Sequence, residues 1–385
     1  MSLVTRVVLV CPVPMPYTFP VLRLIAASAE VDLSVLYCRR ALPARGDAPD
    51  PASFGFRHEF LADAGHVFVG RKIREIDVNP GLLRAIARLQ PDLVVFSGYV
   101  QPTAVLGAVW SALRGRAYGL WVESHDLGSR STPKRVARRL LVGPIVRRAA
   151  LLLPTGEAAA ASLAALGSAD ERMVHFPHVP DPEAFHARDR ERAGTALRAR
   201  LGVDAETPVI VYVGRLVDCK GLETLLEAQR EVHGRTRARL LVVGTGPLER
   251  SLRAMGAPGV EFLGFLPPAQ VAEVLRGADI SISPSVSEPW GTVPLEAAAS
   301  GCVVVASDVV PSAAELIAQS GVGALVPPGD RRALASAIVD ILSDPVALRE
   351  LSERTVERAA RFTPELAAAS FLEGVRSALA TRGRH

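Results

Sequence analysis

The sequence predicts an α/β protein with two doubly wound, Rossmann-like domains that face each other across a cleft. Three observations predict this class. The chain of 385 residues is too long for one ordinary hydrophobic core. Continuously apolar, β-branched runs alternate with helical patterns, as in parallel sheets covered on both faces. The alternation breaks once, at 177–208, where a proline-punctuated and then charged stretch contains no buried strand and is expected to link the domains.

The first domain is expected over about 1–180. Its predicted strands are RVVLVC (6–11), DLSVLY (32–37), HVFVG (66–70), DLVVFS (92–97), AYGLWVES (117–124) and LLLPT (151–155). Its predicted helices are 80–89, 134–149 and 157–166. The continuous apolar character of these strands predicts a sheet that is buried on both sides.

The second domain is expected over about 181–385. Its predicted strands are PVIVYVG (208–214), RLLVVG (239–244), VEFLG (260–264), DISIS (279–283) and CVVVAS (302–307). Its predicted helices are 221–233, 247–255, 268–277 and 331–343. A last helix, 364–382, follows Phe362-Thr363-Pro364 and has the length to cross back to the first domain.

Composition excludes several classes of function. The net charge is only +4 and aromatic residues make up 5%, which argues against nucleic acid as a partner. Four scattered cysteines without C-x-x-C spacing indicate reduced thiols of a cytosolic protein. The N-terminus runs directly into a strand pattern, and no uncharged apolar stretch reaches about 18 residues, so neither a signal peptide nor a membrane span is predicted.

The segment EPWGTVPLE is the most informative motif of the chain. Glu288 and Glu296 lie eight positions apart, between the predicted strand 279–283 and the predicted strand 302–307. Pro294 is compatible with a helix that begins near Gly291 or Thr292, which places Glu296 one turn inside it. Free amide groups can hold a phosphate at such a helix start, while carboxylates accept hydrogen bonds from sugar hydroxyls. The alternatives are an exposed loop acid and a first-turn acid that stabilises the helix dipole.

A second motif, VYVGRLVDCKG, follows the predicted strand 208–214. Arg215 and Lys220 flank a short loop before a helix, an arrangement that suits a pyrophosphate. The alternative is a solvated loop with two ordinary surface cations. That alternative weighs more for Arg215 because the chain has 41 arginines, and less for Lys220 because it has only three lysines.

Two further turns follow predicted strands. In LLVVGTGPLER, Gly244 and Gly246 half-match a dinucleotide fingerprint, but Glu249 occupies the third glycine position, so a hydride-transfer enzyme is disfavoured. A tight strand–helix turn explains Gly246 as well as ligand contact does. The loop Gly264-Phe265-Leu266 has a backbone that could face a flat base, although both apolar side chains favour packing in the core or the loop. Asp279 is expected to anchor the start of a strand.

These segments, in this order over about 208–330, resemble the retaining glycosyltransferases of family 4, which have the GT-B fold. The resemblance implies that Arg215 and Lys220 bind the donor diphosphate and that Glu296 binds ribose hydroxyls. It further implies that Glu288 and the 291–293 amides meet the donor sugar and phosphate, and that the 264–267 loop faces the base. The implied donor-binding set is Gly214, Arg215, Lys220, Gly244, Gly264, Phe265, Leu266, Glu288, Gly291, Thr292, Val293 and Glu296.

The N-terminal half resembles the family more loosely. The segment WVESHDLGSRSTPKRVARRLL matches the one that brings a histidine to the transferred sugar. That histidine is His125 here, and Asp126 and Glu123 are weaker candidates for a role at this site. The first strand leads into PVPMPY where many relatives carry a glycine pair. Met15 and Tyr17 in that segment are assigned to the acceptor. A second departure, VVPSAAE after Asp308, lacks the usual glycine and leaves the placement of Glu315 open.

The resemblance implies a metal-independent transfer of a hexose-type sugar from a nucleotide-sugar to an acceptor hydroxyl, with retention of configuration and no cofactor. The implied catalytic set is His125, Glu288, Arg215 and Lys220, and no D-x-D pair is present to hold a metal. UDP is the first choice of nucleotide, before TDP and GDP. The acceptor is a small molecule, a lipid-linked compound or a polysaccharide primer. A non-hydrolysing sugar-nucleotide epimerase and a catalytically silent binding subunit are the alternatives.

A basic stretch at 131–148 contains no acid. On a helix, Arg135, Arg138 and Arg139 share one face, which is either solvated or in contact with an anionic membrane or acceptor. The expected location is therefore the cytoplasm, with peripheral contact at the inner membrane face as an option.

Overall fold

The computed structural model describes residues 4–40, 50–62, 78–99, 101–123 and 132–382. They form two compact units. Unit 1 comprises the chain up to His178 together with the segment from Pro364 onward, and unit 2 comprises Val179–Thr363. Among the described residues, no helix is long and apolar enough to cross a membrane.

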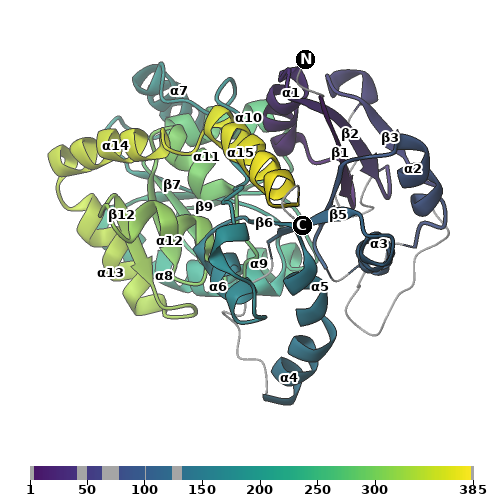
Figure 1. Cartoon of the computed structure of the whole chain (residues 1–385). Coiled ribbons are helices and arrows are strands. Elements are labelled where there is room, and N and C mark those ends of the chain that lie inside the picture. Colours follow the sequence, from purple (N-terminus) through teal and green to yellow (C-terminus); the bar gives the residue numbers. More distant parts are fainter. Residues whose placement is uncertain (1–3, 41–49, 63–77, 100, 124–131, 383–385) are drawn as a thin grey trace. The chain divides into compact units, whose positions relative to one another are not determined.

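Unit 1 is built on six parallel strands in the order β3-β2-β1-β4-β5-β6 (Figure 1). The strands are β1 (Thr5–Cys11), β2 (Val31–Tyr37), β3 (His58–Phe60), β4 (Leu93–Ser97), β5 (Ala117–Val122) and β6 (Leu151–Pro154). The interior strands are buried on both faces, as their continuous Val and Leu runs predict. The predicted strand 66–70 lies outside the described residues, and the edge strand β3 was not predicted because three residues carry no periodic pattern.

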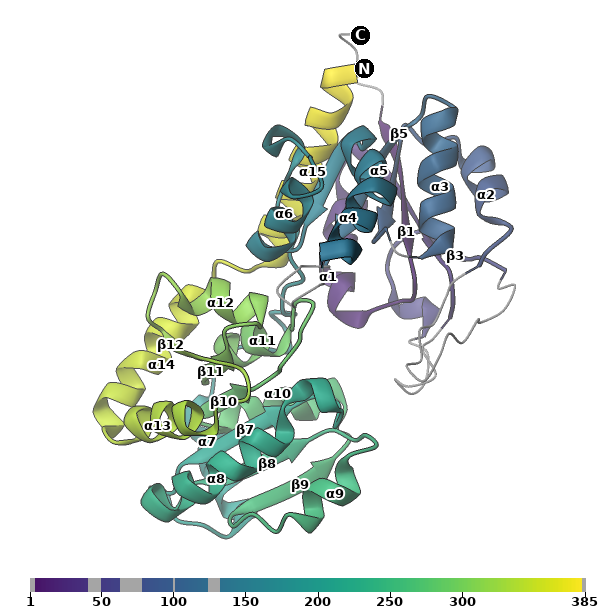
Figure 2. The same cartoon turned by 90° about the horizontal axis from the view of Figure 1, so that it is seen from below.

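Helices cover both faces of this sheet, and Figure 2 shows several of them along one face. The described helices of unit 1 are α1 (Phe19–Ala27), α2 (Leu82–Leu89), α3 (Pro102–Leu113), α4 (Thr132–Leu141), α5 (Gly143–Arg148), α6 (Glu157–Ala164) and α15 (Pro364–Arg382). Helices α2, α3, α5 and α6 share one apolar core with the sheet. The last helix, α15, contacts α1 and β6.

The prediction of one helix over 134–149 is wrong. The structure has two helices there, α4 and α5, which meet at Val142 and Gly143. Pro144 lies in the first turn of α5 and has no N–H group to continue the preceding helix, so the predicted single helix is divided here.

Unit 2 has a second sheet of six parallel strands, in the order β12-β11-β10-β7-β8-β9. The strands are β7 (Val209–Val213), β8 (Arg239–Val243), β9 (Val260–Gly264), β10 (Ile280–Ser283), β11 (Val303–Ser307) and β12 (Gly323–Val326). The helices are α7 (Arg190–Leu201), α8 (Leu222–Thr236), α9 (Glu249–Ala254), α10 (Pro268–Gly277), α11 (Val293–Ala299), α12 (Pro311–Ile317), α13 (Arg331–Leu342) and α14 (Pro345–Ala359).

Much of the stretch predicted as a linker, 177–208, is ordered structure of unit 2. Its charged part forms α7, which packs against α10 and buries Leu197. Gly202, with φ +63°, ends this helix in the left-handed conformation. This helix was not predicted, because it carries too few apolar residues to show a clear periodic face.

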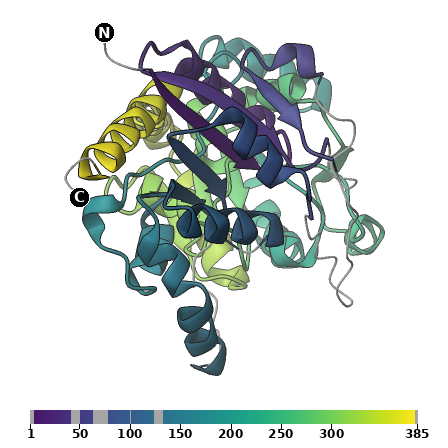
Figure 3. The same ribbon diagram turned by 45° about the vertical axis from the view of Figure 1, so that its right-hand side comes forward.

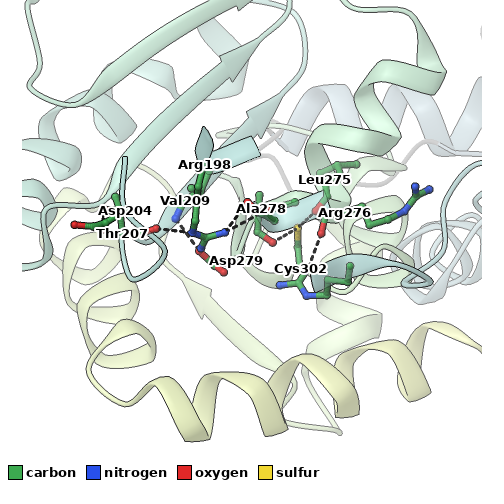
Figure 4. A network of polar contacts seen from close by, with 12 residues as sticks. Arg198, Asp204, Thr207, Val209, Leu275, Arg276, Ala278, Asp279 and Cys302 are labelled. Carbon is green, nitrogen blue, oxygen red and sulfur yellow. Dashed lines mark hydrogen bonds and ion pairs between the residues drawn. The ribbon is translucent and has the colours of Figure 1, made fainter. Parts of the chain in front are cut away.

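The amino ends of the unit 2 strands are tied together by a polar network (Figure 4). Asp279, just before β10, accepts hydrogen bonds from the Val209 amide at 2.7 Å and from the Arg198 guanidinium at 2.6 Å. Arg198 also donates to the Thr207 carbonyl oxygen at 3.0 Å. Asp279 therefore anchors a strand start, as predicted, and leaves the opposite, carboxyl edge of the sheet for ligands.

Candidate functional site

The predicted donor residues of unit 2 gather at the carboxyl ends of four strands, in the spatial order β10, β7, β8 and β9. Gly214 follows β7, Gly244 follows β8, and Gly264 ends β9. The loop 284–292 follows β10 and leads into α11. Because these strands are parallel and hydrogen-bonded neighbours, their carboxyl ends meet along one edge, where open α/β sheets bind ligands.

Glycines allow the carboxyl ends of β7, β8 and β9 to lie against one another. The Gly214 amide donates to the Val243 carbonyl at 3.0 Å, and the Gly244 amide donates to the Gly264 carbonyl at 2.7 Å. Gly244 has φ +126°, and a Cβ atom there would lie 2.0 Å from the Gly214 carbonyl oxygen. A side chain at this position would therefore separate the loops after β7 and β8.

The loops after β7 and β8 are also joined through Leu216. Its amide donates to the Thr245 carbonyl at 3.0 Å, and its own carbonyl accepts from the Leu248 amide at 3.1 Å. A Cβ atom on Gly246 would lie 2.4 Å from the Leu216 carbonyl oxygen. This close backbone approach explains Gly246 without a ligand.

The loops after β7 and β10 are joined in the same way. The Val286 amide donates to the Cys219 carbonyl at 2.9 Å. Gly221 has φ +67°, and a Cβ atom on it would lie 2.0 Å from the Pro284 carbonyl oxygen. Only glycine permits this approach, which brings the neighbouring Lys220 to the loop that carries Glu288.

Lys220 and Glu288 form an ion pair in which the Lys220 ammonium donates to Glu288 Oε2. The Ser285 hydroxyl donates to the same oxygen at 3.3 Å. Both side chains are largely buried, so the pair is screened less by solvent than a surface pair. The resemblance implies contacts of the two residues with different parts of the donor, and no sequence pattern indicates their pairing, since 68 positions separate them.

Arg215 lies five positions before Lys220 in the chain and is exposed. The Tyr212 hydroxyl donates to its carbonyl oxygen at 2.9 Å, which fixes the backbone directly after β7. Within the described part of the chain, the Arg215 guanidinium has no ion pair. The carboxyl end of β7 therefore carries one exposed cation and one partly neutralised cation.

Helix α11 begins at Val293, with Thr292 as its N-cap residue, close to the predicted start. The preceding turn is fixed by α12, because the Ser312 hydroxyl donates to the Gly291 carbonyl and the Ser312 amide donates to the buried Trp290 carbonyl at 3.2 Å. Gly291 has φ +81°, which favours glycine. The first turn of α11 thus has a fixed backbone beside Glu288.

Glu296 lies in this first turn and is only partly exposed. Burial raises the pKa of its carboxyl group to about 7, and a hydrogen bond with Thr292 opposes part of this effect. The carboxylate form, which accepts hydrogen bonds from hydroxyl groups, therefore becomes dominant only above neutral pH in the protein alone.

Phe265 and Leu266 were expected to pack in the core or the loop, and the structure gives them different environments. Leu266 packs against the apolar core of unit 2. Phe265 is 68% exposed at the carboxyl end of β9. Gly264, just before Phe265, has φ +70°, a left-handed conformation that favours glycine.

Unit 1 has its own polar group at the carboxyl end of β5. Glu123 follows this strand, and its Oε1 atom lies 2.6 Å from Nε2 of the buried His178. The ring of Tyr17 meets the His178 ring edge-on at 4.9 Å, and a small cavity lies between them and Trp121. Met15 precedes this segment and is partly exposed.

His178 was missed by sequence analysis, because its partner is 55 positions away and no local motif marks it. His125 and Asp126 lie outside the described residues, so their predicted roles stay predictions. Glu315 is partly buried in α12, where its carbonyl accepts from Arg358 at 2.8 Å. Among the described residues, no group of His, Cys, Asp and Glu could hold a metal ion.

Comparison with known families identifies the region that contains the unit 2 edge. A family model described as "Glycosyl transferases group 1" matches 207–344, which includes every predicted donor residue. The matched region is therefore similar to the group 1 glycosyl transferases. It contains β7 to β12, the Lys220–Glu288 pair and Glu296.

Curated relatives extend the similarity beyond the matched region 207–344. The D-inositol 3-phosphate glycosyltransferase of Segniliparus rotundus is 31% identical over 271 residues, which cover 67% of this chain and 59% of that protein. The alpha-D-kanosaminyltransferase of Streptomyces kanamyceticus is 31% identical over 221 residues, or 56% of each chain. The chain thus spans less than two thirds of the length of these relatives.

Solved structures match nearly the whole chain. HepE of Anabaena in complex with UDP has a TM-score of 0.75 at 20% identity, covering 97% of this chain and all of that one. The sucrose-phosphate synthase of Thermosynechococcus elongatus has a TM-score of 0.72 at 23% identity, covering 98% of this chain and 100% of that one. The predicted fold of two Rossmann-like domains, as in the GT-B glycosyltransferases, is confirmed.

Proposed function

We propose that this protein is a retaining glycosyltransferase that moves a hexose-type sugar from a nucleotide-sugar to an acceptor hydroxyl. A UDP-sugar is the first choice of donor. One observation carries the proposal: Arg215 and Lys220, after β7, share one strand edge with Glu288 and Glu296, after β10, in the region that matches the group 1 glycosyl transferases. The structural neighbour from Anabaena is described in complex with UDP and with UDP-glucose, which supports the choice of nucleotide.

The leaving group of this reaction is a nucleoside diphosphate. Arg215 and Lys220 offer two positive charges at the end of β7, and the backbone at the start of α11 offers amide donors nearby. Fixed charges aimed at a group that becomes more negative stabilise the transition state without a bound metal or other cofactor. We infer that Lys220 turns from Glu288 to the diphosphate, since the anion carries the larger charge.

This exchange leaves the Glu288 carboxylate available for hydroxyl groups of the transferred sugar. Glu296, eight positions further along, would accept hydrogen bonds from the ribose hydroxyls. The bond between the anomeric carbon and the diphosphate oxygen breaks as the acceptor oxygen bonds to the same face of the sugar. The acceptor proton passes to that diphosphate oxygen, which balances the reaction and retains the configuration.

The acceptor belongs to unit 1 in this proposal, near Met15, Tyr17 and the stretch with His125 and Asp126. One relative is named for D-inositol 3-phosphate, which favours a small polyhydroxylated acceptor over a polysaccharide primer. A lipid-linked acceptor is the second choice. We expect His125→Ala to lower turnover more than nucleotide affinity.

The decisive test is calorimetric titration with UDP, TDP and GDP, repeated on Glu296→Ala. Tight binding of one nucleotide that is lost in the variant supports the site and fixes the base. Absence of binding to all three favours the silent-subunit alternative. Incubation with UDP-sugar alone separates the remaining alternative, because an epimerase changes the sugar without any acceptor.

A further inference from the structure

Helix α3 of unit 1 presents an apolar face to solvent. The helix, PTAVLGAVWSAL, contains no charged residue. Its inner side packs tightly, since a Cβ atom on Gly107 would lie 2.4 Å from the Phe96 ring. On its outer side, Leu106 is 52% exposed and Leu113 is 81% exposed, with Val109 exposed between them. A surface helix normally turns polar side chains outward, so this face is expected to contact an apolar partner.

Helix α4 adds a second exposed apolar surface. Leu140 is 70% exposed and Leu141 is 74% exposed, and Val136 is exposed one turn earlier. Figures 1 and 3 show α4 projecting from the rest of unit 1. Arg138 points the other way, donating to the Tyr99 hydroxyl and, at 2.9 Å, to the Ser162 hydroxyl. The expected basic face of Arg135, Arg138 and Arg139 is therefore wrong for Arg138, which is turned into the protein.

The same side of unit 1 is strongly basic. Helices α2, α3, α4 and α5 together contain eight Arg and Lys residues and no Asp or Glu. The guanidinium groups of Arg114 and Arg116, just after α3, lie 5.5 and 5.6 Å from the centre of the partly exposed Trp110 ring. Because the net charge of the whole chain is only +4, these basic helices show that positive charge is distributed unevenly over the protein.

We propose that α3 and α4 form a docking surface for an anionic lipid bilayer. The exposed leucines and valines enter the boundary between headgroups and acyl chains, and the flanking arginines meet lipid phosphates. Trp110, beside two arginines, is the kind of ring that settles at this interface. A second copy of the chain is a poorer occupant, because it would bring two surfaces with an excess of positive charge together; of the basic residues counted, Arg88 is paired with Glu59. The proposal stands independently of the proposed sugar transfer.

The chain contains its own probe for this contact. Of its three tryptophans, Trp121 and Trp290 are buried and Trp110 alone is partly exposed. Addition of phosphatidylcholine vesicles containing phosphatidylglycerol is expected to shift the tryptophan emission to shorter wavelength and to sediment the protein. Vesicles of phosphatidylcholine alone are expected to do neither, and Trp110→Phe is expected to bind without the shift.

Variants locate the contact. Leu106→Gln with Leu113→Gln, or Leu140→Gln with Leu141→Gln, is expected to weaken vesicle binding about tenfold or more. Arg139→Gln is expected to weaken it about fivefold. Val346→Gln with Leu366→Gln, on the exposed sides of α14 and α15, is the matched control and is expected to bind normally. UDP affinity, measured in parallel, is expected to be unchanged in all variants, which separates this test from that of the donor site.

Three outcomes would overturn the proposal. Failure of the wild-type chain to bind vesicles with phosphatidylglycerol is the first, and equal loss in the control variant is the second. The third is a dimer, measured by light scattering, that separates in the α3 or α4 variants; that result would assign the surface to self-association.

Discussion

The carboxyl edges of the two sheets are organised by different parts of the chain. In unit 2, backbone groups join the loops, as in the bonds from Gly244 to Gly264 and from Val286 to Cys219. In unit 1, buried side chains add to backbone bonds such as those from Arg39 to Pro12 and from Gly98 to Trp121. Asn79 donates to the Cys38 carbonyl at 2.9 Å and to the Ala62 carbonyl at 3.1 Å. Thr103 donates to the Asn79 side chain in turn.

This difference explains why one edge could be read from the sequence more fully than the other. Backbone approaches closer than a Cβ atom permits require glycine, so Gly221, Gly244 and Gly246 leave a visible spacing in the sequence. A side-chain hub such as Asn79 or the Glu123–His178 pair leaves no spacing, because its partners come from distant segments. The close glycine approaches of the donor edge are thus visible in the sequence, whereas long-range side-chain contacts, at either edge, are not.

The largest expected effect tests the role of backbone shape. Gly221→Ala places a Cβ atom 2.0 Å from the Pro284 carbonyl oxygen and should force the two loops apart. We expect loss of UDP binding and a decrease of about 4 kcal/mol or more in the free energy of unfolding. Calorimetry and urea unfolding measure both.

Gly98, at the carboxyl end of β4 in unit 1, is the matched control. It also has positive φ, +82°, but its added Cβ atom would have nothing within 4 Å. Gly98→Ala should therefore cost only about 1–2 kcal/mol for the left-handed conformation. Equal losses of stability in the two variants would contradict the comparison between the edges.

The next effect concerns the Lys220–Glu288 pair. Lys220→Ala should weaken UDP binding about 30- to 100-fold, because it removes a charge-assisted bond to the diphosphate. It should also lower stability by about 2 kcal/mol, since Glu288 is left largely buried without its cation. Arg250→Ala, an exposed cation on α9, is the control. Wild-type affinity in Lys220→Ala would exclude this residue from the donor site.

A pH-dependent effect is expected at Glu296. Because burial raises the pKa of this carboxyl from 4.5 to about 7, the folded chain binds the proton more tightly than the unfolded chain. This contribution to stability is complete below the unfolded pKa and is lost as the pH rises through about 7. Glu296→Gln should therefore stabilise the protein above neutral pH, by about 3 kcal/mol at most, and change little at about pH 4.

Donor binding should show the opposite trend in the wild-type protein. UDP affinity should rise with pH around neutrality, as the carboxylate that accepts ribose hydroxyls forms, and Glu296→Gln should abolish this rise. Thermal unfolding and calorimetry across the pH range measure the two trends. A pH-independent difference in stability between wild type and variant would show that the carboxyl titrates normally.

The smallest effect is expected in unit 1. Glu123→Gln keeps an acceptor for His178 but removes the charge, so the free energy of unfolding should fall by only about 1 kcal/mol. UDP affinity should stay within about twofold of wild type, because this pair belongs to the other unit. A tenfold loss of UDP affinity would show that the two edges are not independent.

Sequence alone determined the fold class, most strands and the segments of the donor edge, because parallel strands and glycine turns are local patterns. It also placed the start of α11 within two residues. It gave one helix where Pro144 divides two, and it left α7 inside a linker. Predicted roles such as that of His125, which lies outside the described residues, stay predictions.

Only the tertiary structure decided which side chains meet. It paired Lys220 with Glu288, paired Glu123 with His178, turned Phe265 outward and turned Arg138 inward. Burial of Glu296, and with it the raised pKa, also depends on neighbours that pack against α11 from elsewhere in the chain. The physical reason is common to all of these: hydrogen bonds, desolvation and exposure depend on distances in space, and a linear pattern records only the distances along the chain.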